Sequence, residues 1–152
     1  DLFAPVAMLS PSFTIATLEA RADDVLAAAD VAITASGTAT VQTAMHERPM
    51  VIVYRVSPLT YQLGKRFVTV STYGMANLVA GERIVPELIQ DGFTPEAVAA
   101  ETLRYFDDPA YAARTRDRLR DVRAALGATG ASRRAAEQVL EVCALAGRPS
   151  ST

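Results

Sequence analysis

A turn of small and hydroxylated residues is the part of this sequence whose residue types best suit the binding of a charged group. Ser36, Gly37 and Thr38 interrupt two apolar stretches within the segment ADVAITASGTATVQTAMHERPMVIVYR, residues 29–55. If a strand ends before this turn and a helix begins after it, the first N–H groups of the helix lack partners and attract an anion. Gly37 leaves room for that anion, and the two hydroxyl groups add donors. These features predict a phosphate or diphosphate site.

A structural interpretation of the same three residues stays open at this point. Ser36 would then cap the helix, and Gly37 would relieve the turn. The Ser-Gly-Thr pattern lacks the glycine spacing of a dinucleotide-binding fingerprint and the lysine of a P-loop. The tripeptide alone therefore favours neither interpretation.

The elements on either side of the turn must bring it to one edge of a sheet. Apolar and β-branched residues predict strands at 12–18, 31–34 and 50–53, with helices at 21–28 and 38–46 between them. Because the last of these strands is apolar on both faces, it suits a parallel sheet covered by helices on both sides. Ligands of such sheets bind at the carboxyl ends of the strands. The inward side chains expected of the two helices are Val25 and Leu26, and Val41, Ala44 and Met45.

After the predicted sheet, the chain continues with a helix and an ambiguous segment. Ser57 as a cap and Pro58 in the first turn predict a helix over 58–70. Residues 73–79 are compatible with either a short strand or an ordered loop.

Three further helices are predicted toward the C-terminus. Thr94 caps and Pro95 begins the first, Pro109 begins a second that ends near Gly127, and the third covers 132–145. Apolar residues at helical spacing mark the faces expected to be buried. They are Val98, Leu103 and Phe106; Leu119, Val122 and Leu126; and Ala136, Val139, Leu140 and Cys143. We therefore predict a single α/β domain with a Rossmann-like parallel sheet, flanking helices and a helical C-terminal trailer.

Composition excludes several classes of function. The 152 residues are 50% hydrophobic and 21% charged, which is typical of a folded globular domain. A formal net charge of −2 provides no general attraction to nucleic acid. The single cysteine, Cys143, excludes an internal disulfide and suits a reducing cytoplasm. We find no apolar run long enough to cross a bilayer and no signal peptide, and the start at Asp1 is expected of a processed product or a fragment.

Three sequence blocks carry a resemblance to a known family. ASGTAT, PMVIVYR and NLVAGERIVPELIQ occur in this order at close spacing, with SPLTYQLGKRFV between the last two and a helical tail ending AAEQVL. Over residues 22–142 the chain resembles the C-terminal half of the lipid-A-disaccharide synthase family. Other glycosyltransferases of the GT-B fold, and the related sugar-nucleotide epimerases, share a glycine-containing turn before a helix. The third block distinguishes this resemblance from theirs.

The resemblance implies the C-terminal domain of a GT-B fold, with residues 1–147 as the UDP-sugar donor domain and 148–152 as a flexible tail. The N-terminal acceptor domain would be missing. The family transfers 2,3-diacylglucosamine from UDP to 2,3-diacylglucosamine 1-phosphate with inversion, which gives the β-1,6-linked lipid A disaccharide. No metal or cofactor is implied. The catalytic base is expected in the missing half, since Glu19, Glu47 and Glu82 stand as isolated acids in this sequence.

The resemblance also implies roles in donor binding for several residues beyond Ser36, Gly37 and Thr38. Arg55 would neutralise the departing diphosphate, although a surface ion pair is the alternative. Gln42 stands where the family usually has a glutamate that binds the ribose, and it still offers an acceptor oxygen. Asn77 would lie beside the donor pocket or else form a turn; Ala76 replaces the proline that usually precedes it. Tyr54 would stack near the nucleotide or belong to the core.

Partners and location follow from the same resemblance. We expect a cytoplasmic protein that binds both acylated sugars, contacts the inner membrane peripherally and does not bind nucleic acid; a homo-oligomer is left open. Apolar Leu59, Tyr61 and Leu63 beside Lys65 and Arg66 would suit a membrane surface, but core packing is the favoured role for most of this helix.

Basic residues elsewhere receive plainer interpretations. The seven arginines between residues 114 and 134 alternate with acids as on a solvated helix face, and His46 is expected to be solvated at a helix end. Two alternative functions stay open: half of a sugar-nucleotide epimerase, and a nucleotide-binding module without chemistry.

Overall fold

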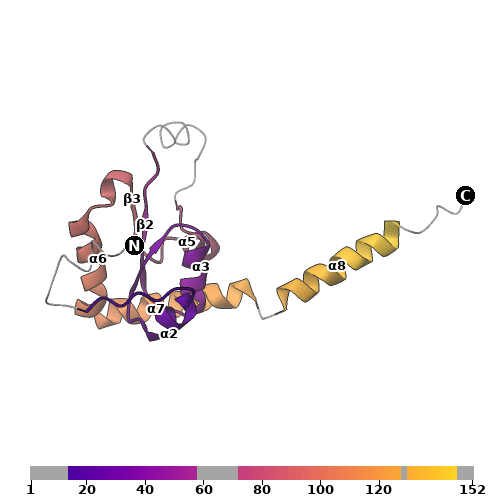
Figure 1. The fold of residues 1–152 in the computed structure, drawn as a ribbon, viewed down its shortest axis with the longest axis horizontal. Coiled ribbons are helices and arrows are strands. Elements are labelled where there is room, and N and C mark those ends of the chain that lie inside the picture. Colours follow the sequence, from indigo (N-terminus) through magenta and orange to yellow (C-terminus); the bar gives the residue numbers. More distant parts are fainter. Residues whose placement is uncertain (1–13, 58–71, 128–129, 147–152) are drawn as a thin grey trace, which may run out of the picture.

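A three-stranded parallel sheet forms the centre of the molecule (Figure 1), in a computed structural model that describes residues 14–57, 72–127 and 130–146. The strands are β1 (Ala32–Ala35), β2 (Met50–Tyr54) and β3 (Glu87–Ile89), in the order β1-β2-β3. Ala32 lies opposite Met50, and Ile52 lies opposite Glu87. The predicted α/β architecture with a parallel sheet is confirmed.

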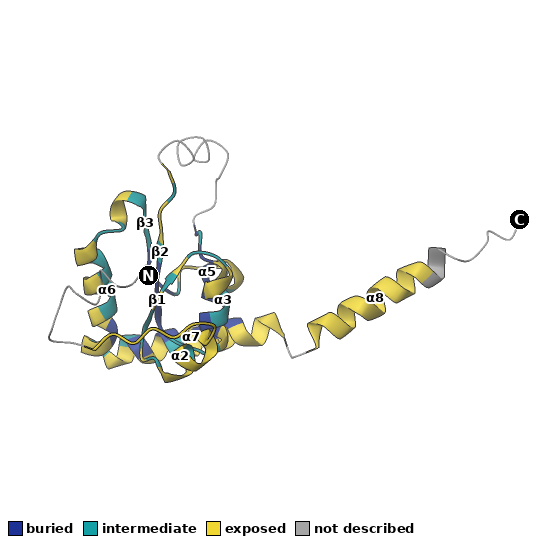
Figure 2. Cartoon of the chain, in the orientation of Figure 1, coloured by how far each residue is buried: buried dark blue, intermediate teal, exposed yellow. Residues whose placement is uncertain are grey.

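The central strand β2 is buried on both faces, as its apolar sequence predicts. Met50 and Ile52 belong to one hydrophobic cluster, and Val51 between them belongs to another. This alternation follows from the two-residue period of a strand. The first cluster also contains Ala44, Ala76, Val85, Leu119 and Val122, and the second contains Tyr105 and Ala112. Buried residues therefore gather where the sheet meets the helices (Figure 2).

Helices cover both faces of the sheet (Figure 1). The described helices are α2 (Ala22–Ala28), α3 (Thr38–Met45), α5 (Met75–Ala80), α6 (Pro95–Asp107), α7 (Pro109–Leu126) and α8 (Ala131–Ala146), with a short 3-10 turn η1 (Gln90–Gly92) after β3. Helices α3, α5 and α7 pack against one another, and α6 contacts α7 and β2. The turn between β1 and α3 therefore lies at the edge of a sheet that helices cover on both faces.

Side-chain caps define the starts of α6 and α7. Thr94 Oγ1 accepts a hydrogen bond from the N–H of Ala97 at 3.2 Å, and Pro95 is the first helical residue, as predicted. Asp108 caps α7 in the same way, with its carboxylate accepting from the N–H of Tyr111 at 2.8 Å. Each cap satisfies a donor that the first helical turn would otherwise leave unpaired.

One predicted strand is wrong, and one segment left open between strand and loop is a helix. Residues 14–18 form no strand, and the first two residues of that prediction, 12 and 13, lie outside the described residues. Their β-branched composition favours a strand, but no strand pairs with residues 14–18 in the described part of the chain. The sheet has instead a strand that was not predicted, β3, which is only three residues long and begins with an acid. Residues 73–79, predicted as strand or loop, contain most of helix α5.

The buried face of α3 differs from the predicted one. Met45 is exposed and Val41 only half-buried, whereas Thr40 and Thr43 join Ala44 in the interior. Threonine is accommodated there because its hydroxyl bonds to the preceding turn: Thr40 to the carbonyl of Gly37 at 2.7 Å, and Thr43 to that of Ala39 at 2.8 Å. Hydrophobicity alone therefore identified Ala44 correctly but missed the two threonines and misplaced Met45. In α2, Val25 is exposed as well.

Helix α6 buries Tyr105 rather than the predicted apolar residues. Leu103 and Phe106 are each 55% exposed, and Val98 is half-buried. Tyr105 donates its hydroxyl hydrogen to the carbonyl of Met50 at 3.2 Å and stacks on Tyr111 with ring centroids 4.9 Å apart. Burial raises the pKa of the Tyr105 phenol. A satisfied hydroxyl thus lets the tyrosine occupy the interior.

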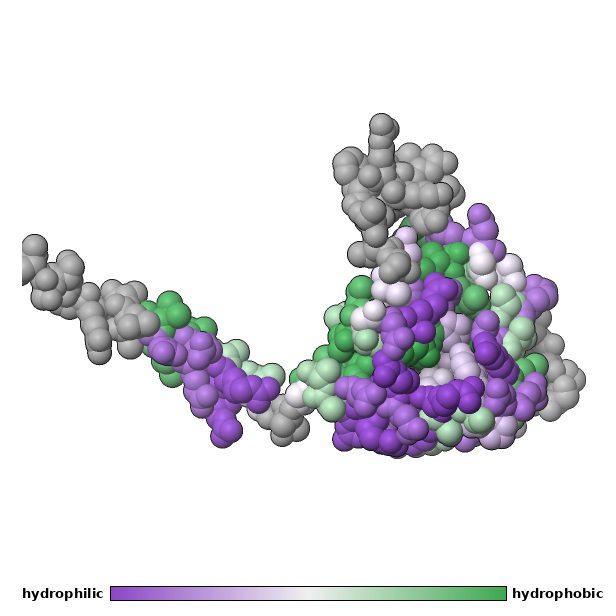
Figure 3. All heavy atoms as spheres, turned by 180° about the vertical axis from the view of Figure 1, so that it is seen from behind, coloured by the Kyte–Doolittle hydropathy of each residue, from purple (hydrophilic) through white to green (hydrophobic). Residues whose placement is uncertain are grey.

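Helix α8 extends away from the sheet (Figure 1), and its predicted inward residues are all exposed. Figure 3 shows hydrophobic residues along one side of α8 and hydrophilic residues along the other. The helix is amphipathic, as its periodicity predicts, but no described element covers the apolar side, formed by residues such as Val139 and Leu140. In α7, Leu119 and Val122 are buried as predicted, and Leu126 is exposed.

Several predictions fall on residues outside the described part. These are the helix at 58–70, the apolar and basic side chains within it, and the tail at 148–152. None of the described helices combines the length and the apolarity needed to cross a bilayer.

Candidate functional site

The turn between β1 and α3 has the backbone geometry that the sequence predicts. The N–H of Ser36 donates to the carbonyl of Val53 at 3.0 Å, which extends the pairing of β1 and β2 to the base of the turn. Gly37 then precedes α3 with φ of 137° and ψ of −158°. A Cβ atom there would meet nothing within 4 Å. Glycine is therefore favoured at residue 37 by the positive φ and not by a lack of space.

Three consecutive backbone amides at this turn are available to a ligand. Among the residues that the structure describes, the N–H groups of Gly37, Thr38 and Ala39 have no hydrogen-bond partner. The N–H of Thr40 is the first to bond, to the carbonyl of Gly37 at 3.1 Å. Thr38 is exposed, and its hydroxyl has no partner in the described part of the chain. We call residues 36–39 the open turn; it offers amides and a hydroxyl to an anion.

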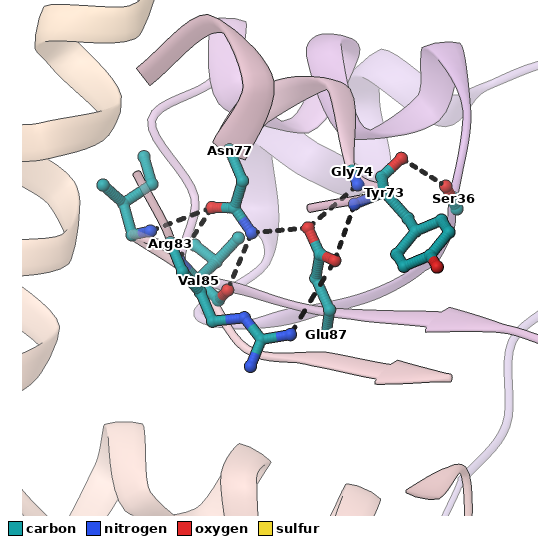
Figure 4. A network of polar contacts seen from close by, with 8 residues as sticks. Ser36, Tyr73, Gly74, Asn77, Arg83, Val85 and Glu87 are labelled. Carbon is teal, nitrogen blue, oxygen red and sulfur yellow. Dashed lines mark hydrogen bonds and ion pairs between the residues drawn. The ribbon is translucent and has the colours of Figure 1, made fainter. Parts of the chain in front are cut away.

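Ser36 has a different local role from Thr38. Its hydroxyl donates to the carbonyl of Tyr73 at 2.9 Å, just before α5 (Figure 4). An anion at the turn would have to compete with that carbonyl for the Ser36 hydrogen. The side chain therefore ties the open turn to the start of α5.

Gln42 lies one turn along α3, on the side that faces α2. Its amide donates to Asp23 Oδ1 at 2.9 Å, and His46 Nε2 lies 2.9 Å from the same oxygen. The hydrogen bond from Gln42, and then that from His46, holds the pKa of Asp23 below its ordinary value. His46, predicted to be solvated, is thus half-buried and paired. Gln42 also lines a cavity of about 440 Å³ beside Thr34 and Ala39.

Arg55 follows β2 and turns toward the segment after β3. Its Nη2 donates to the carbonyl of Phe93 at 2.8 Å, and the guanidinium lies 5.2 Å from the centre of the Phe93 ring. Neither partner is an acid, so Arg55 does not form the alternative surface ion pair with any described residue. Tyr54 precedes Arg55 at the end of β2. Because Tyr54 is exposed, it is not a core residue.

Asn77 is completely buried, and all its hydrogen-bonding capacity is used within the protein. Its side-chain oxygen accepts from the N–H groups of Ile84 at 2.9 Å and Val85 at 3.1 Å. Its NH2 group donates to the carbonyl of Val85 at 3.0 Å and to Glu87 Oε1 at 2.7 Å (Figure 4). The side chain organises the loop between α5 and β3.

Glu87 is the central polar residue that the sequence analysis missed. Its side chain is 0% exposed, and its carboxylate accepts from the N–H of Tyr73 at 2.8 Å and of Gly74 at 2.9 Å as well as from Asn77. Arg83 Nη2 lies 3.9 Å away. We call Tyr73, Gly74, Asn77, Val85 and Glu87 the buried network, which Ser36 of the open turn contacts through Tyr73 (Figure 4). An acid beginning a short apolar strand, as in PELIQ, is the one sequence signal that could have found it.

The acids described as isolated are partly paired, and the arginine-rich surface of α7 explains this. Glu47 contacts Arg123 at 2.9 Å and Arg120 at 3.4 Å, and Glu82 pairs with Arg118. The arginines of α7 thus form the solvated, ion-paired face predicted from their spacing with acids. Within residues 14–57, 72–127 and 130–146, no three His, Cys, Asp or Glu side chains come together to hold a metal ion.

Comparisons with known proteins agree with the resemblance. The sequence model of the lipid-A-disaccharide synthetase family matches residues 6–142. The chain is similar to proteins named lipid-A-disaccharide synthase from Geobacter sulfurreducens (53% identical, covering 80% of this chain and 32% of the relative) and Myxococcus xanthus (44%, covering 82% and 33%). It thus spans about a third of the length of the curated relatives it matches. On these grounds, the chain belongs to the lipid-A-disaccharide synthetase family.

Proposed function

We propose that this chain is the donor-binding part of a lipid-A-disaccharide synthase. The whole protein would transfer 2,3-diacylglucosamine from UDP to the 6-hydroxyl of 2,3-diacylglucosamine 1-phosphate. The products would be the β-1,6-linked disaccharide and UDP. Family membership and the names of the relatives support this proposal.

The unpartnered amides of Gly37, Thr38 and Ala39 carry the proposal. When the bond between the anomeric carbon and the diphosphate breaks, negative charge develops on the departing UDP. Fixed N–H donors and the helix dipole at the open turn would stabilise that charge without rearranging. The Thr38 hydroxyl would add one more donor.

The attacking half of the reaction would come from outside this chain. The acceptor hydroxyl attacks the anomeric carbon on the face opposite UDP, which inverts the configuration, and its proton passes to a base. Glu47 and Glu82 are engaged by arginines, and Glu87 is buried in its network. We therefore assign the base and the acceptor site to the part of the full-length protein that precedes this chain.

Three further residues receive supporting roles in the proposal. The Gln42 oxygen has no partner among the described residues, although its NH2 group binds Asp23, so it can accept a hydrogen bond from a ribose hydroxyl. Arg55 would have to leave Phe93 to reach a diphosphate. Asn77 would act through the loop that it organises, because its own polar atoms are used. The protein would work at the cytoplasmic face of the inner membrane.

A ligand titration of the 152-residue chain tests the proposal. We expect weak but measurable affinity for UDP, at least tenfold weaker affinity for uridine, which lacks the diphosphate, and no disaccharide synthesis. Competition between UDP-diacylglucosamine and UDP-N-acetylglucosamine separates this function from an epimerase, since only a lipid enzyme should prefer the acylated sugar. Equal affinity for UDP and uridine would contradict the proposed role of the turn.

A further inference from the structure

We propose that Glu87 is a positioning residue for the open turn, acting through the backbone of Tyr73 and Gly74. This inference rests on the proposed function of the turn but concerns a different part of the molecule. Glu87 belongs to β3 and does not touch residues 37–39 in any described contact.

The first step is the carboxylate itself. A buried carboxylate is costly unless several donors satisfy it, and Glu87 has three N–H donors at 2.7 to 2.9 Å. Two of them are consecutive backbone amides, those of Tyr73 and Gly74. The carboxylate therefore fixes where the chain enters α5.

The second step is the close packing around Gly74. A Cβ atom on Gly74 would lie 2.3 Å from Ile52 Cδ1 and 3.1 Å from Glu87 Oε1. The backbone can approach the carboxylate and the sheet this closely only because residue 74 has no side chain. Gly74 has an ordinary φ of −81°, so space and not backbone conformation explains the glycine.

The third step connects this backbone to the turn. Tyr73 gives its N–H to Glu87 and accepts the Ser36 hydroxyl on its carbonyl at 2.9 Å. Glu87, the Tyr73 backbone and Ser36 thus form a continuous chain of hydrogen bonds that ends one residue before Gly37 (Figure 4). At the Glu87 end of this chain, Asn77 donates to the carboxylate and accepts from the N–H of Val85, in the segment that leads into β3.

The Glu87→Gln variant tests the proposal because it keeps the size of the side chain. One acceptor oxygen becomes an NH2 group, which then faces an N–H of Tyr73 or Gly74. Without ligand, we expect the amide NMR signals of Gly37 and Thr38 to shift. Tyr105→Phe is the matched control, because it removes a buried hydrogen bond on the opposite face of the sheet and should leave those signals in place.

A double-mutant cycle on UDP affinity separates positioning from general destabilisation. We expect Glu87→Gln to weaken UDP binding by about tenfold, as for the loss of one good hydrogen bond. If Glu87 acts through Ser36, adding Ser36→Ala should weaken binding little further, whereas independent effects would multiply. Multiplying effects, or unmoved signals of Gly37 and Thr38, would overturn the proposal.

Ser36→Ala covers the case in which Glu87→Gln does not fold. Because coupling is reciprocal, this change at the turn should accelerate hydrogen exchange at the amides of Tyr73 and Gly74. Unchanged exchange there would refute the link. If the unmodified chain does not bind UDP at all, the proposed function fails, but the ligand-free comparisons still decide whether Glu87 positions the turn.

Discussion

The open turn and the buried network are both rich in polar atoms, yet they differ in how those atoms are used. At the open turn, three consecutive amides have no partner among the described residues. In the buried network, both polar atoms of Asn77 and both oxygens of Glu87 are bonded. Saturated groups hold structure in place, and unsatisfied donors at a helix start are free to bind a ligand.

A sequence block typical of a family can therefore have one of two roles: it can bind the ligand, or it can support the segment that does. SGT lies where a ligand would bind, and NLVAGERIVPELIQ contains Asn77 and Glu87, which hold the backbone of Tyr73 and Gly74 next to it. The two regions touch at a single hydrogen bond, from Ser36 to Tyr73. Substitutions in the two regions should therefore separate loss of stability from loss of ligand affinity.

Removal of the Asn77 side chain should have the largest effect on stability. Asn77→Ala leaves the N–H groups of Ile84 and Val85 without their acceptor and removes one of the three N–H donors to the Glu87 carboxylate. We expect the free energy of unfolding to fall by about 3 kcal/mol, measured by urea denaturation. Gln138→Ala, an exposed amide on α8, is the control and should change it by less than about 0.5 kcal/mol. Similar small losses in both variants would mean that the network is not a main source of stability.

Gly74→Ala should come next, because the new Cβ atom would overlap Ile52. Overpacking of this kind costs about 2 kcal/mol in thermal or chemical unfolding. Gly92→Ala is the matched control, since a Cβ atom there meets nothing within 4 Å. An unchanged midpoint for Gly74→Ala would show that β2 and α5 pack less closely than described.

Gly37→Ala should affect binding more than stability. The positive φ makes alanine unfavourable by about 1 to 2 kcal/mol, and relaxation of the turn would redirect its amides. We expect the dissociation constant for UDP to rise at least tenfold. Gly81→Ala shares the positive φ and the open surroundings but ends α5, so it should lose stability without losing UDP affinity. Equal effects of both variants on binding would remove the distinction between the regions.

Gln42→Glu should have a small effect. The new carboxylate would repel Asp23, and stability should fall by less than about 1 kcal/mol because the Asp23 side chain is exposed and residue 42 is only half-buried. UDP affinity should stay equal or become tighter, because a charged acceptor binds a ribose hydroxyl more strongly. A clear loss of affinity in a titration would show that residue 42 does not reach the ribose.

The smallest expected effect is that of low pH on the local stability of α2. The pKa of Asp23 lies below its ordinary value of 3.8 in the folded chain, because Gln42 and His46 bond to the charged form. The contribution of Asp23 to stability is therefore fully present above pH 3.8, and it is lost as the pH falls through the lowered pKa of the folded chain. Hydrogen exchange in α2 should accelerate at such low pH, and Asp23→Asn should remove this dependence. If hydrogen exchange in α2 did not change at low pH, the contact of Asp23 with Gln42 and His46 would be contradicted.

The local patterns of the sequence predicted the part of the fold around the turn. Continuous apolar residues predicted β1 and β2, and Gly37 predicted the turn between a strand and a helix. Thr94 and Pro95 predicted the start of α6. Each of these features depends on neighbours within a few residues, which a sequence pattern records directly.

Long-range contacts account for what the sequence did not predict. Ser36 and Tyr73 are 37 residues apart, and nothing local indicates that a carbonyl will meet the serine hydroxyl. Burial of Thr40 and Tyr105 depends on partners that satisfy their hydroxyls. Glu87 went unrecognised because an acid at the start of a three-residue strand contradicts the apolar pattern until its three donors are known.

The most direct test is a map of backbone amide NMR signals during titration of this chain with UDP. The account predicts that the signals of Gly37, Thr38 and Ala39 move most, and that uridine at the same concentration leaves them in place. Movement centred on another part of the chain, such as Arg55 and Phe93, with the three turn amides unaffected, would contradict it.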